Sequence, residues 1–241
     1  MSSSTHTAAF SSNPRGSVVT QAIGTELRPV AVIENFAPHP DALVAYAEDG
    51  VPFQAAPKDL YPGVRKPAPA EYLEDVCKRY GDALREYFGL PKSSVARVIF
   101  SALSITTTEP QRLRPVQRVP HFDTSAANQL AIVHYLCGPE HGGTSFYRHR
   151  STGFETITHE RLHRYAETIK REVMSEHPPR ERYMDGDDAL FARVASYEAQ
   201  YNRALIYPSN VLHSGDIRRV SPPDAPLHAV RLTVNSFVRF E

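Results

Sequence analysis

The sequence Pro120-His-Phe-Asp123 is followed by Gln129-Leu-Ala-Ile-Val-His-Tyr-Leu136 and by Gly142-Gly-Thr-Ser-Phe146. The second segment is rich in apolar and β-branched residues, and a glycine pair leads into the third, which is typical of short strands joined by tight turns. Side chains two residues apart on an extended segment point to the same face. His121 and Asp123 therefore present an imidazole and a carboxylate that can contact one ion.

The remaining pattern predicts further strands and several helices. Apolar and β-branched runs predict strands over 28–36, 95–107, 144–147, 204–211 and 229–240. Helical spacing predicts helices over 71–87, 159–173 and 188–201, and one that begins within 38–41. The proline-rich stretch 51–69 is expected to be a loop. The expected fold class is mainly β with flanking helices (α+β).

Length and composition limit the domain count and the class of partner. The chain has 241 residues, with 27 Lys plus Arg and 27 Asp plus Glu. This balance argues against a general nucleic-acid or membrane-surface binder. The sequence predicts a flexible N-terminal tail over 1–25 and one domain over 26–241, with a helical insert at about 155–203.

Cysteine use and the N-terminus bear on the compartment. Cys77 and Cys137 lie far apart in the sequence and have no CxxC spacing, so reduced thiols are expected. No run approaches the length of a membrane span, and the polar N-terminus lacks the apolar stretch of a signal peptide. A cytoplasmic location without membrane contact is the expectation.

A second imidazole completes a set of metal-ligand residue types. His213 follows the strand-like run 204–211 and precedes Ser214-Gly215. Two histidines and one carboxylate are the protein ligands of the facial triad in non-haem Fe(II) oxygenases, which leaves open positions on the metal. A His-x-Asp sequence alone is weak evidence, because most histidines are exposed or hydrogen-bonded structural residues. The ordered combination of His121, Asp123 and His213 strengthens it.

The quoted segments resemble the core of the prolyl-hydroxylase-like Fe(II)/2-oxoglutarate dioxygenases. In that family a His-x-Asp leads into a strand that ends in Tyr-Leu, and a Gly-Gly turn, a distal His and a basic residue follow. The resemblance covers about residues 95–240. It implies a double-stranded β-helix (jelly-roll or cupin-like) core with an N-terminal α/β segment and a helical insert. It also implies iron ligation by His121, Asp123 and His213.

The resemblance further implies that Arg231 binds the C5 carboxylate of 2-oxoglutarate, with Thr233 and Tyr135 as helpers. Arg is suited to this role because its planar guanidinium binds a carboxylate with two parallel hydrogen bonds. About 90 residues separate Asp123 from His213, and the gap from His213 to Arg231 is also longer than usual in this family. Arg218 and Arg219 are therefore rivals, although Arg231 is preferred because it is expected inside a strand.

The implied activity is an Fe(II)- and 2-oxoglutarate-dependent hydroxylation, or another C–H oxidation, with release of succinate and CO2. The substrate would be a small molecule or an amino-acid side chain, with a carboxylate-bearing compound as one candidate. Two alternatives remain: a cupin-like protein that binds a metal or ligand without catalysis, and an Fe(II) dioxygenase that does not use 2-oxoglutarate. A homodimer is one candidate oligomeric state.

Several polar residues are candidates for substrate contact, each with a plainer explanation. Arg65 belongs to a Pro/Gly loop that lines the substrate entrance or is simply solvated. Tyr147 and Arg148 follow the Gly-Gly strand and are either near the open end of the barrel or in a charged turn. Asn128 either contacts substrate or caps a strand. Asn235 alternates in phase with Arg231 and Thr233, which places it on the same strand face.

Overall fold

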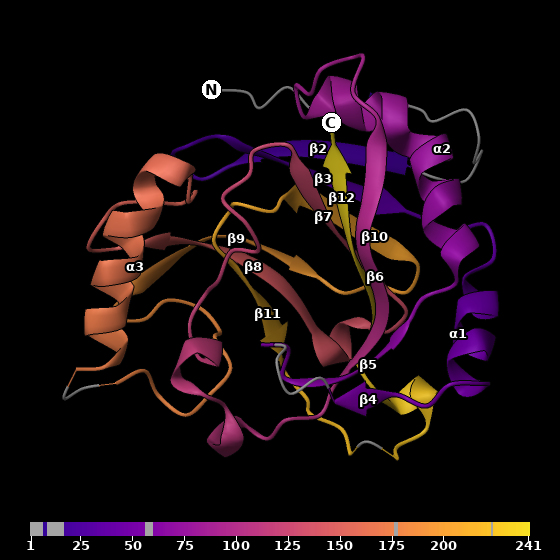
Figure 1. The fold of residues 1–241 in the computed structure, drawn as a ribbon. Coiled ribbons are helices and arrows are strands. Elements are labelled where there is room, and N and C mark those ends of the chain that lie inside the picture. The colour runs from indigo at the N-terminus through magenta and orange to yellow at the C-terminus, as the bar shows by residue number, and fades with distance from the viewer. Residues whose placement is uncertain (1–6, 9–16, 56–59, 176–177, 223) are drawn as a thin grey trace.

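The computed structural model describes residues 7–8, 17–55, 60–175, 178–222 and 224–241. Its strands form two antiparallel sheets (Figure 1). The large sheet has the strand order β1-β2-β3-β10-β7-β12-β6-β5-β4, and the small sheet has the order β11-β8-β9.

The large sheet consists of β1 (Thr7–Ala8), β2 (Ser17–Ile23), β3 (Arg28–Glu34), β4 (Gln54–Ala55), β5 (Gly63–Pro67), β6 (Ala96–Thr106), β7 (Gln129–Tyr135), β10 (Arg203–Pro208) and β12 (Leu232–Phe240). The small sheet consists of β8 (Gly142–His149), β9 (Phe191–Glu198) and β11 (His213–Ile217). The helices are α1 (Pro40–Glu48), α2 (Ala70–Tyr87) and α3 (His159–Val173). Short 3-10 helices cover η1 (Pro110–Arg112), η2 (Pro115–Gln117), η3 (Pro139–His141) and η4 (Leu227–Ala229).

Both faces of the large sheet are buried at its central strands, and successive residues of a strand belong to different core clusters. On β7, Leu130 and Ile132 belong to a core cluster that includes Tyr80 of α2. Ala131 and Tyr135 point the other way and share a second cluster with Phe146 of the small sheet. Successive side chains of a strand point to opposite faces, so β7 packs on α2 with one face and on the small sheet with the other.

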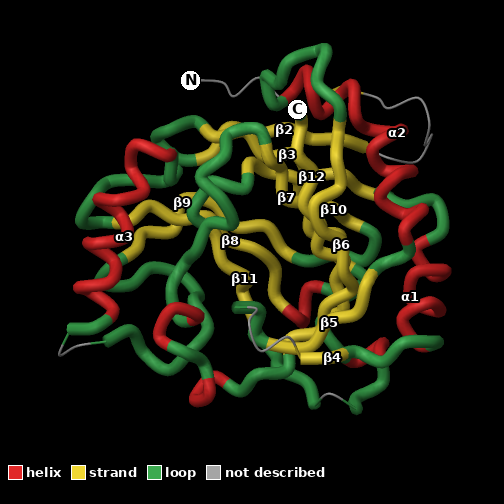
Figure 2. The backbone as a smooth tube through the Cα atoms, in the orientation of Figure 1, coloured by secondary structure: helices red, strands yellow, loops and turns green. Residues whose placement is uncertain are grey.

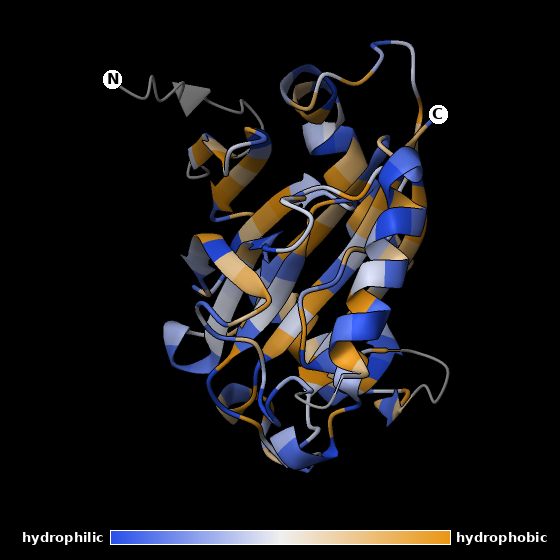
Figure 3. Ribbon diagram, turned by 90° about the vertical axis from the view of Figure 1, so that its left-hand side faces the viewer, coloured by the Kyte–Doolittle hydropathy of each residue, from blue (hydrophilic) through white to orange (hydrophobic). Residues whose placement is uncertain are grey.

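The helices lie outside the two sheets (Figure 2). Helix α3 packs on the small sheet, because Tyr165 and Val173 share a buried cluster with Tyr147 and Phe191. In Figure 1, α3 lies on the opposite side of the molecule from α1 and α2. Hydrophobic residues follow the strands, whereas the helices also carry hydrophilic residues (Figure 3). No helix in the described part of the chain is long and apolar enough to cross a membrane.

Most of the predicted elements are confirmed. The expected strands at 28–36, 95–107, 144–147, 204–211 and 229–240 correspond to β3, β6, β8, β10 and β12. The helices expected within 38–41, over 71–87 and over 159–173 correspond to α1, α2 and α3. The mainly β architecture with flanking helices is confirmed by two antiparallel sheets and three helices. Cys77 and Cys137 are free thiols, as expected.

Three local predictions are wrong. The helix expected over 188–201 is strand β9, which pairs with β8. The Asp188 carboxylate accepts the backbone N–H groups of Leu190 and Phe191, so a turn begins the strand. The expected helical insert at about 155–203 therefore contains α3 and then a strand.

The other two concern segments expected to be irregular. Residues 17–23, expected in the flexible tail, form β2 and pair with β3, while 1–6 and 9–16 lie outside the described residues. Within the expected loop 51–69, Gly63–Pro67 forms β5 and pairs with β6. A Cβ on Gly63 would lie 2.0 Å from the Ile105 carbonyl oxygen, so glycine permits this close pairing.

Candidate metal centre

Backbone hydrogen bonds bring the three predicted metal ligands together. His121 and His213 form an isolated antiparallel bridge, and the backbone N–H of each donates to the carbonyl of the other at 2.8 Å. The backbone N–H of Asp123 donates to the Ser209 carbonyl, also at 2.8 Å. One ligand atom from each of His121, Asp123 and His213 lies within 4.8 Å of the other two. Backbone hydrogen bonds to residues 209 and 213, at the start of β11 and just before it, thus position His121 and Asp123 beside His213.

The side-chain atoms in this cluster are oriented for metal binding. Nδ1 of His213 lies 2.9 Å from the Val211 carbonyl oxygen, an acceptor, so Nδ1 carries the proton and Nε2 keeps its lone pair. Nε2 of His213 lies 3.9 Å from Asp123 Oδ2, and Nε2 of His121 lies 3.9 Å from Asp123 Oδ1. Asp123 Oδ2 is buried and has no hydrogen-bond partner. A buried carboxylate oxygen without a donor is unfavourable unless a cation occupies the site.

Burial sets the protonation of the cluster. Burial lowers the pKa of His213 to about 4. The pKa of His121 is lowered to about 4 by desolvation within the cavity and then by the neighbouring His213, although 56 % of the His121 side chain is exposed. Burial raises the pKa of Asp123 to about 6, against the opposing effects of His121 and Arg65. At neutral pH both imidazoles are uncharged and Asp123 is ionised, which are the forms that coordinate a metal.

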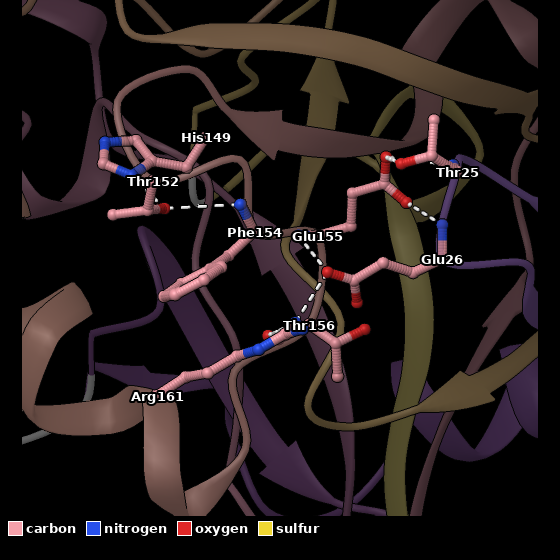
Figure 4. Close-up of polar contacts among 8 residues, drawn as sticks. All are labelled: Thr25, Glu26, His149, Thr152, Phe154, Glu155, Thr156 and Arg161. Carbon is pink, nitrogen blue, oxygen red and sulfur yellow. Dashed lines mark hydrogen bonds and ion pairs between the residues drawn. The ribbon is translucent and has the colours of Figure 1, made fainter.

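Glu155 holds the backbone next to His213 in place. The backbone carbonyl of Glu155 accepts the N–H of Leu212 at 2.8 Å. Its side chain, 1 % exposed, reaches the turn between β2 and β3 (Figure 4). There the carboxylate accepts the Thr25 N–H at 3.0 Å, the Thr25 hydroxyl at 2.9 Å and the Glu26 N–H at 2.9 Å. Glu155 therefore connects the N-terminal hairpin to the backbone next to a metal ligand.

The metal cluster opens into a cavity of about 410 Å³ between the two sheets. Apolar, polar and two cationic side chains line the cavity beside the three ligands: Leu60, Tyr61, Pro62, Arg65, Thr106, Val116, Gln117, Phe122, Ala131, Ile132, Val133, Thr144, Tyr183, Tyr207, Ser214, Gly215, Ile217, Arg231, Asn235, Ser236 and Phe237. Such a concave site with a few convergent polar groups is typical of small-molecule binding.

Arg231 lies in this cavity and is only 5 % exposed. Its Nη2 donates to the Gly143 carbonyl at 2.9 Å, and its Nε is buried without a hydrogen-bond partner. Its guanidinium carbon lies 5.7 Å from the centre of the Tyr135 ring. Arg231 directly precedes β12 and is not inside the strand, contrary to the prediction. The contacts with Gly143 and Tyr135 hold the side chain instead.

The rival arginines lie elsewhere. Arg218 directly follows β11 and forms an ion pair with Glu198 at 2.9 Å, where both side chains are about half exposed. Neither Arg218 nor Arg219 lines the cavity. Of the three candidates, Arg231 alone shares a cavity with the metal cluster.

The two predicted helper residues pair with each other across β7 and β12, and the ring of one of them, Tyr135, lies against Arg231. Tyr135 is fully buried, and its hydroxyl lies 2.6 Å from the hydroxyl of Thr144, which lines the cavity. Thr233 pairs with Tyr135 across β12 and β7. The Thr233 hydroxyl is buried without a hydrogen-bond partner, but the residue does not line the cavity.

The five predicted substrate residues divide into two groups. Arg65 and Asn235 line the cavity. Tyr147 is buried against Phe191 on the α3 side of the small sheet. The Asn128 side chain donates to the Phe240 carbonyl at 2.8 Å, which is the strand-capping alternative. Neither these two residues nor Arg148 lines the cavity.

Several cavity residues were not predicted from the sequence. Thr144 directly follows the Gly-Gly pair, and Tyr207 lies two residues from Leu205 on the same face of β10, so both positions carried a usable signal. Tyr61 and Tyr183 come from irregular segments, where sequence periodicity gives no information about orientation. The Tyr183 hydroxyl donates to the Thr108 carbonyl at 2.6 Å, which fixes one loop over another.

Together these features define a two-sheet antiparallel β protein with a two-histidine, one-carboxylate site in a cavity. The chain belongs to the family described as "Family of unknown function (DUF6445)", whose model matches residues 14–238. A search of curated proteins found no match to the sequence.

Several solved structures resemble the chain at low sequence identity. The non-haem alpha-ketoglutarate-dependent epimerase SnoN from nogalamycin biosynthesis is 13 % identical over 87 % of this chain and 78 % of its own, with a TM-score of 0.47. HygX from Streptomyces hygroscopicus, with nickel and 2-oxoglutarate bound, is 12 % identical over 87 % and 82 %, with a TM-score of 0.49. AviO1 from Streptomyces viridochromogenes Tue57 is 9 % identical over 93 % and 89 %, with a TM-score of 0.44. Because all three TM-scores are below 0.5, the function of this chain is inferred from its own residues.

Proposed function

We propose that the protein is an Fe(II)- and 2-oxoglutarate-dependent oxygenase that hydroxylates, or otherwise oxidises, a C–H bond of a small molecule or an amino-acid side chain. Succinate and CO2 would be the other products. The proposal depends on one observation above all: a buried Asp123 oxygen without a hydrogen-bond donor faces two neutral imidazoles in a cavity that also holds Arg231. We further propose that the two sheets form a double-stranded β-helix.

The donor set fits ferrous iron. His121 and His213 would bind through Nε2 and Asp123 through its carboxylate, a combination that leaves coordination positions for a cosubstrate and oxygen. The Val211 carbonyl fixes the His213 tautomer that ligation needs. Iron with 2-oxoglutarate supplies an oxidative decarboxylation that is coupled to oxidation of the substrate.

The protein's own residues bind and orient the reactants. Arg231 would bind the C5 carboxylate of 2-oxoglutarate, since its guanidinium is buried and charged in the cavity. Thr144 would contribute its hydroxyl, which the Tyr135 hydroxyl orients, and Thr233 would support this wall. Burial of these groups keeps water away and strengthens each polar contact.

The most direct test is anaerobic addition of Fe(II) and 2-oxoglutarate. We expect a weak visible charge-transfer band in the wild type, because 2-oxoglutarate chelates iron through its keto-acid group. Loss of the band in His121→Ala, but not in the exposed control His163→Ala, would support the site. A protein that binds iron but gives no band would instead be a dioxygenase without 2-oxoglutarate or a cupin-like metal-binding protein without catalysis, and one that binds no metal would be a ligand-binding protein at most.

The compartment is proposed on separate grounds. Cys77 and Cys137 are both free, and reducing compartments keep thiols in this state. We therefore propose a cytoplasmic enzyme in which residues 26–241 act as one domain. Selective labelling of the two thiols in cell extracts, without added reductant, would test this assignment.

A further inference from the structure

The small sheet carries a second buried carboxylate on the face opposite the cavity. Gly215 and Ile217 line the cavity, whereas Asp216 between them on β11 does not, and it is 6 % exposed. Its Oδ2 accepts the Ser145 hydroxyl at 2.6 Å and the Ser196 hydroxyl at 3.2 Å. Its Oδ1 is buried and has no hydrogen-bond donor among the described residues. A buried carboxylate oxygen in this state requires a proton or a cation.

A buried tyrosine hydroxyl lies beside Asp216. Tyr147 of β8 is fully buried, and its hydroxyl has no hydrogen-bond partner within the described part of the chain. Burial, and then the charge of Asp216, raise the pKa of Tyr147, so the two groups lie close together. A hydrogen bond between them would satisfy both, but none joins these two described side chains. The two oxygen atoms, from the paired strands β8 and β11, therefore need a third group.

The surrounding charges do not neutralise Asp216. Burial raises the pKa of its carboxyl, the Ser145 and Ser196 hydroxyls lower it, Asp185 raises it and Arg193 lowers it. Arg193 Nη1 lies 3.4 Å from Asp185 Oδ1, so these two charges offset each other. One negative charge then remains on Asp216, beside three hydroxyl groups. Oxygen is the donor that hard cations prefer, and a single positive charge balances the site.

The buried oxygen atoms lie close to the protein surface. Ser196 is exposed, and the side chain of Asp185 is 69 % exposed. Both residues lie at the rim of the site, since Ser196 donates to Asp216 and Asp185 acts on its charge from the segment before β9. A partly hydrated cation can therefore enter from solvent past these two side chains.

Two segments that contribute to the metal cavity meet at this site. Asp216 follows the metal ligand His213 by three residues on β11, and Asp185 follows the cavity residue Tyr183 by two residues. An ion held by both carboxylates, directly or through water, would attach the segment of Tyr183 to the strand of His213. Such an ion would stabilise two walls of the cavity from outside it.

We propose that Asp216 Oδ1 and the Tyr147 hydroxyl oxygen bind an alkali-metal cation, Na⁺ or K⁺, with the Asp185 carboxylate and water completing its coordination. The cation neutralises Asp216 and fastens residues 183–185 to β11. The site is separate from the iron centre, and the proposal does not rest on the oxygenase function.

The test measures the melting temperature at constant ionic strength. The protein is unfolded in the chlorides of sodium, potassium and choline, with a chelator that removes divalent metals. Choline has the same charge but is too bulky for a buried site. The variants are Asp216→Asn, which removes the charge at nearly the same volume, Tyr147→Phe, which removes the hydroxyl, and Asp82→Asn, a control on a carboxylate that is 99 % exposed.

We expect Na⁺ or K⁺ to raise the melting temperature of the wild type and of Asp82→Asn by about 2–4 °C above the value in choline, as for one weak ligand in a chain of this size. Asp216→Asn should melt at the same temperature in all three salts, and above the wild type in choline, because it lacks the buried charge. Tyr147→Phe should show a smaller shift than the wild type. Equal melting of the wild type in all three salts, or an unchanged shift in either site variant, overturns the proposal.

Hydrogen exchange gives a second measurement that needs no variant. In the more effective salt, the backbone amides of 183–191 and of His213–Ile217 should exchange more slowly than in choline, while those of α2 should change little. Exchange that changes equally in all three segments, or not at all in the first two, overturns the proposal. The charge-transfer band tests the oxygenase function separately, so failure of one proposal leaves the other intact.

Discussion

His121 and His213 exchange two backbone hydrogen bonds of 2.8 Å, and their imidazole centres lie 4.4 Å apart. The two rings therefore both project from one isolated β-bridge, which joins segments that are far apart in the sequence. Because backbone hydrogen bonds join the two segments independently of the side chains, substitutions of these rings should affect metal affinity more than folding.

Replacement of a single ligand should therefore abolish tight metal binding. For His213→Ala we expect Ni(II) affinity to fall by more than about 100-fold, because even loss of an outer partner of a ligand typically lowers affinity by about 10- to 100-fold. Calorimetric titration checks this value. The control His163→Ala removes an exposed histidine of α3 and should bind like the wild type. Unchanged affinity in His213→Ala would rule out the proposed ligand set.

Arg231→Met should separate cosubstrate binding from metal binding. We expect 2-oxoglutarate affinity to fall by about 10- to 100-fold, as for loss of one or two hydrogen bonds to a charged group. Metal affinity should stay within about twofold, because Arg231 is not a ligand. The matched control is Arg218→Met, on an arginine outside the cavity. A loss of 2-oxoglutarate binding in Arg218→Met instead would transfer the role to that residue.

Asp123→Asn should stabilise the metal-free protein at pH 7.5. The pKa of Asp123 is raised to about 6 by burial, so its ionised form is unfavourable in the folded state. At pH 7.5 the substitution removes a penalty of up to about 3 kcal/mol. The advantage should shrink as the pH falls below about 6, because folded wild type then takes up the proton. Urea denaturation with a chelator, at pH 7.5 and pH 5, measures the free energy of unfolding.

The same variant should respond differently to metal. Ni(II) should raise the melting temperature of the wild type but not that of Asp123→Asn, since the amide is a poor ligand. An Asp123→Asn protein that is less stable than metal-free wild type at pH 7.5 would contradict the assignment of Asp123 as a metal-dependent carboxylate.

Glu155→Ala should weaken both folding and metal binding. Its carboxylate accepts three hydrogen bonds from Thr25 and Glu26, and their loss should lower the free energy of unfolding by about 2–4 kcal/mol. The neighbouring strand should then hold His213 less firmly and reduce Ni(II) affinity. Glu160→Gln, on an exposed residue of α3, is the control. If only stability changes, and metal affinity at low temperature is unaffected, Glu155 does not position His213.

The sequence predicted those parts of the fold that local patterns specify. The apolar, β-branched run Gln129–Tyr135 and the helical stripe in His159–Val173 predicted the correct elements, because composition and local periodicity can be read from one sequence. Residues Phe191–Glu198 were expected to be helical, but pairing with β8 overrides their local preference. Strand pairing between distant segments is not visible in one sequence.

The candidate site was predictable to a similar extent. His121 and Asp123 lie in one short motif, and His213 follows a recognisable strand. Arg231 lines the same cavity as these residues, but it precedes the strand and is held by Gly143, whereas the sequence predicted a position inside the strand. Tyr183 approaches the cavity through a loop, and the orientation of a loop residue depends on contacts that spacing does not encode.

The connection from Thr25 through Glu155 to Leu212 and His213 bears on how the protein is made. The hairpin turn is made first, its carboxylate partner follows about 130 residues later, and the second histidine follows later still. A nascent chain thus holds His121 and Asp123 without their third partner while the roughly 90 residues up to His213 are made. Iron capture should therefore await synthesis of His213, which would spare the shorter chain from redox damage.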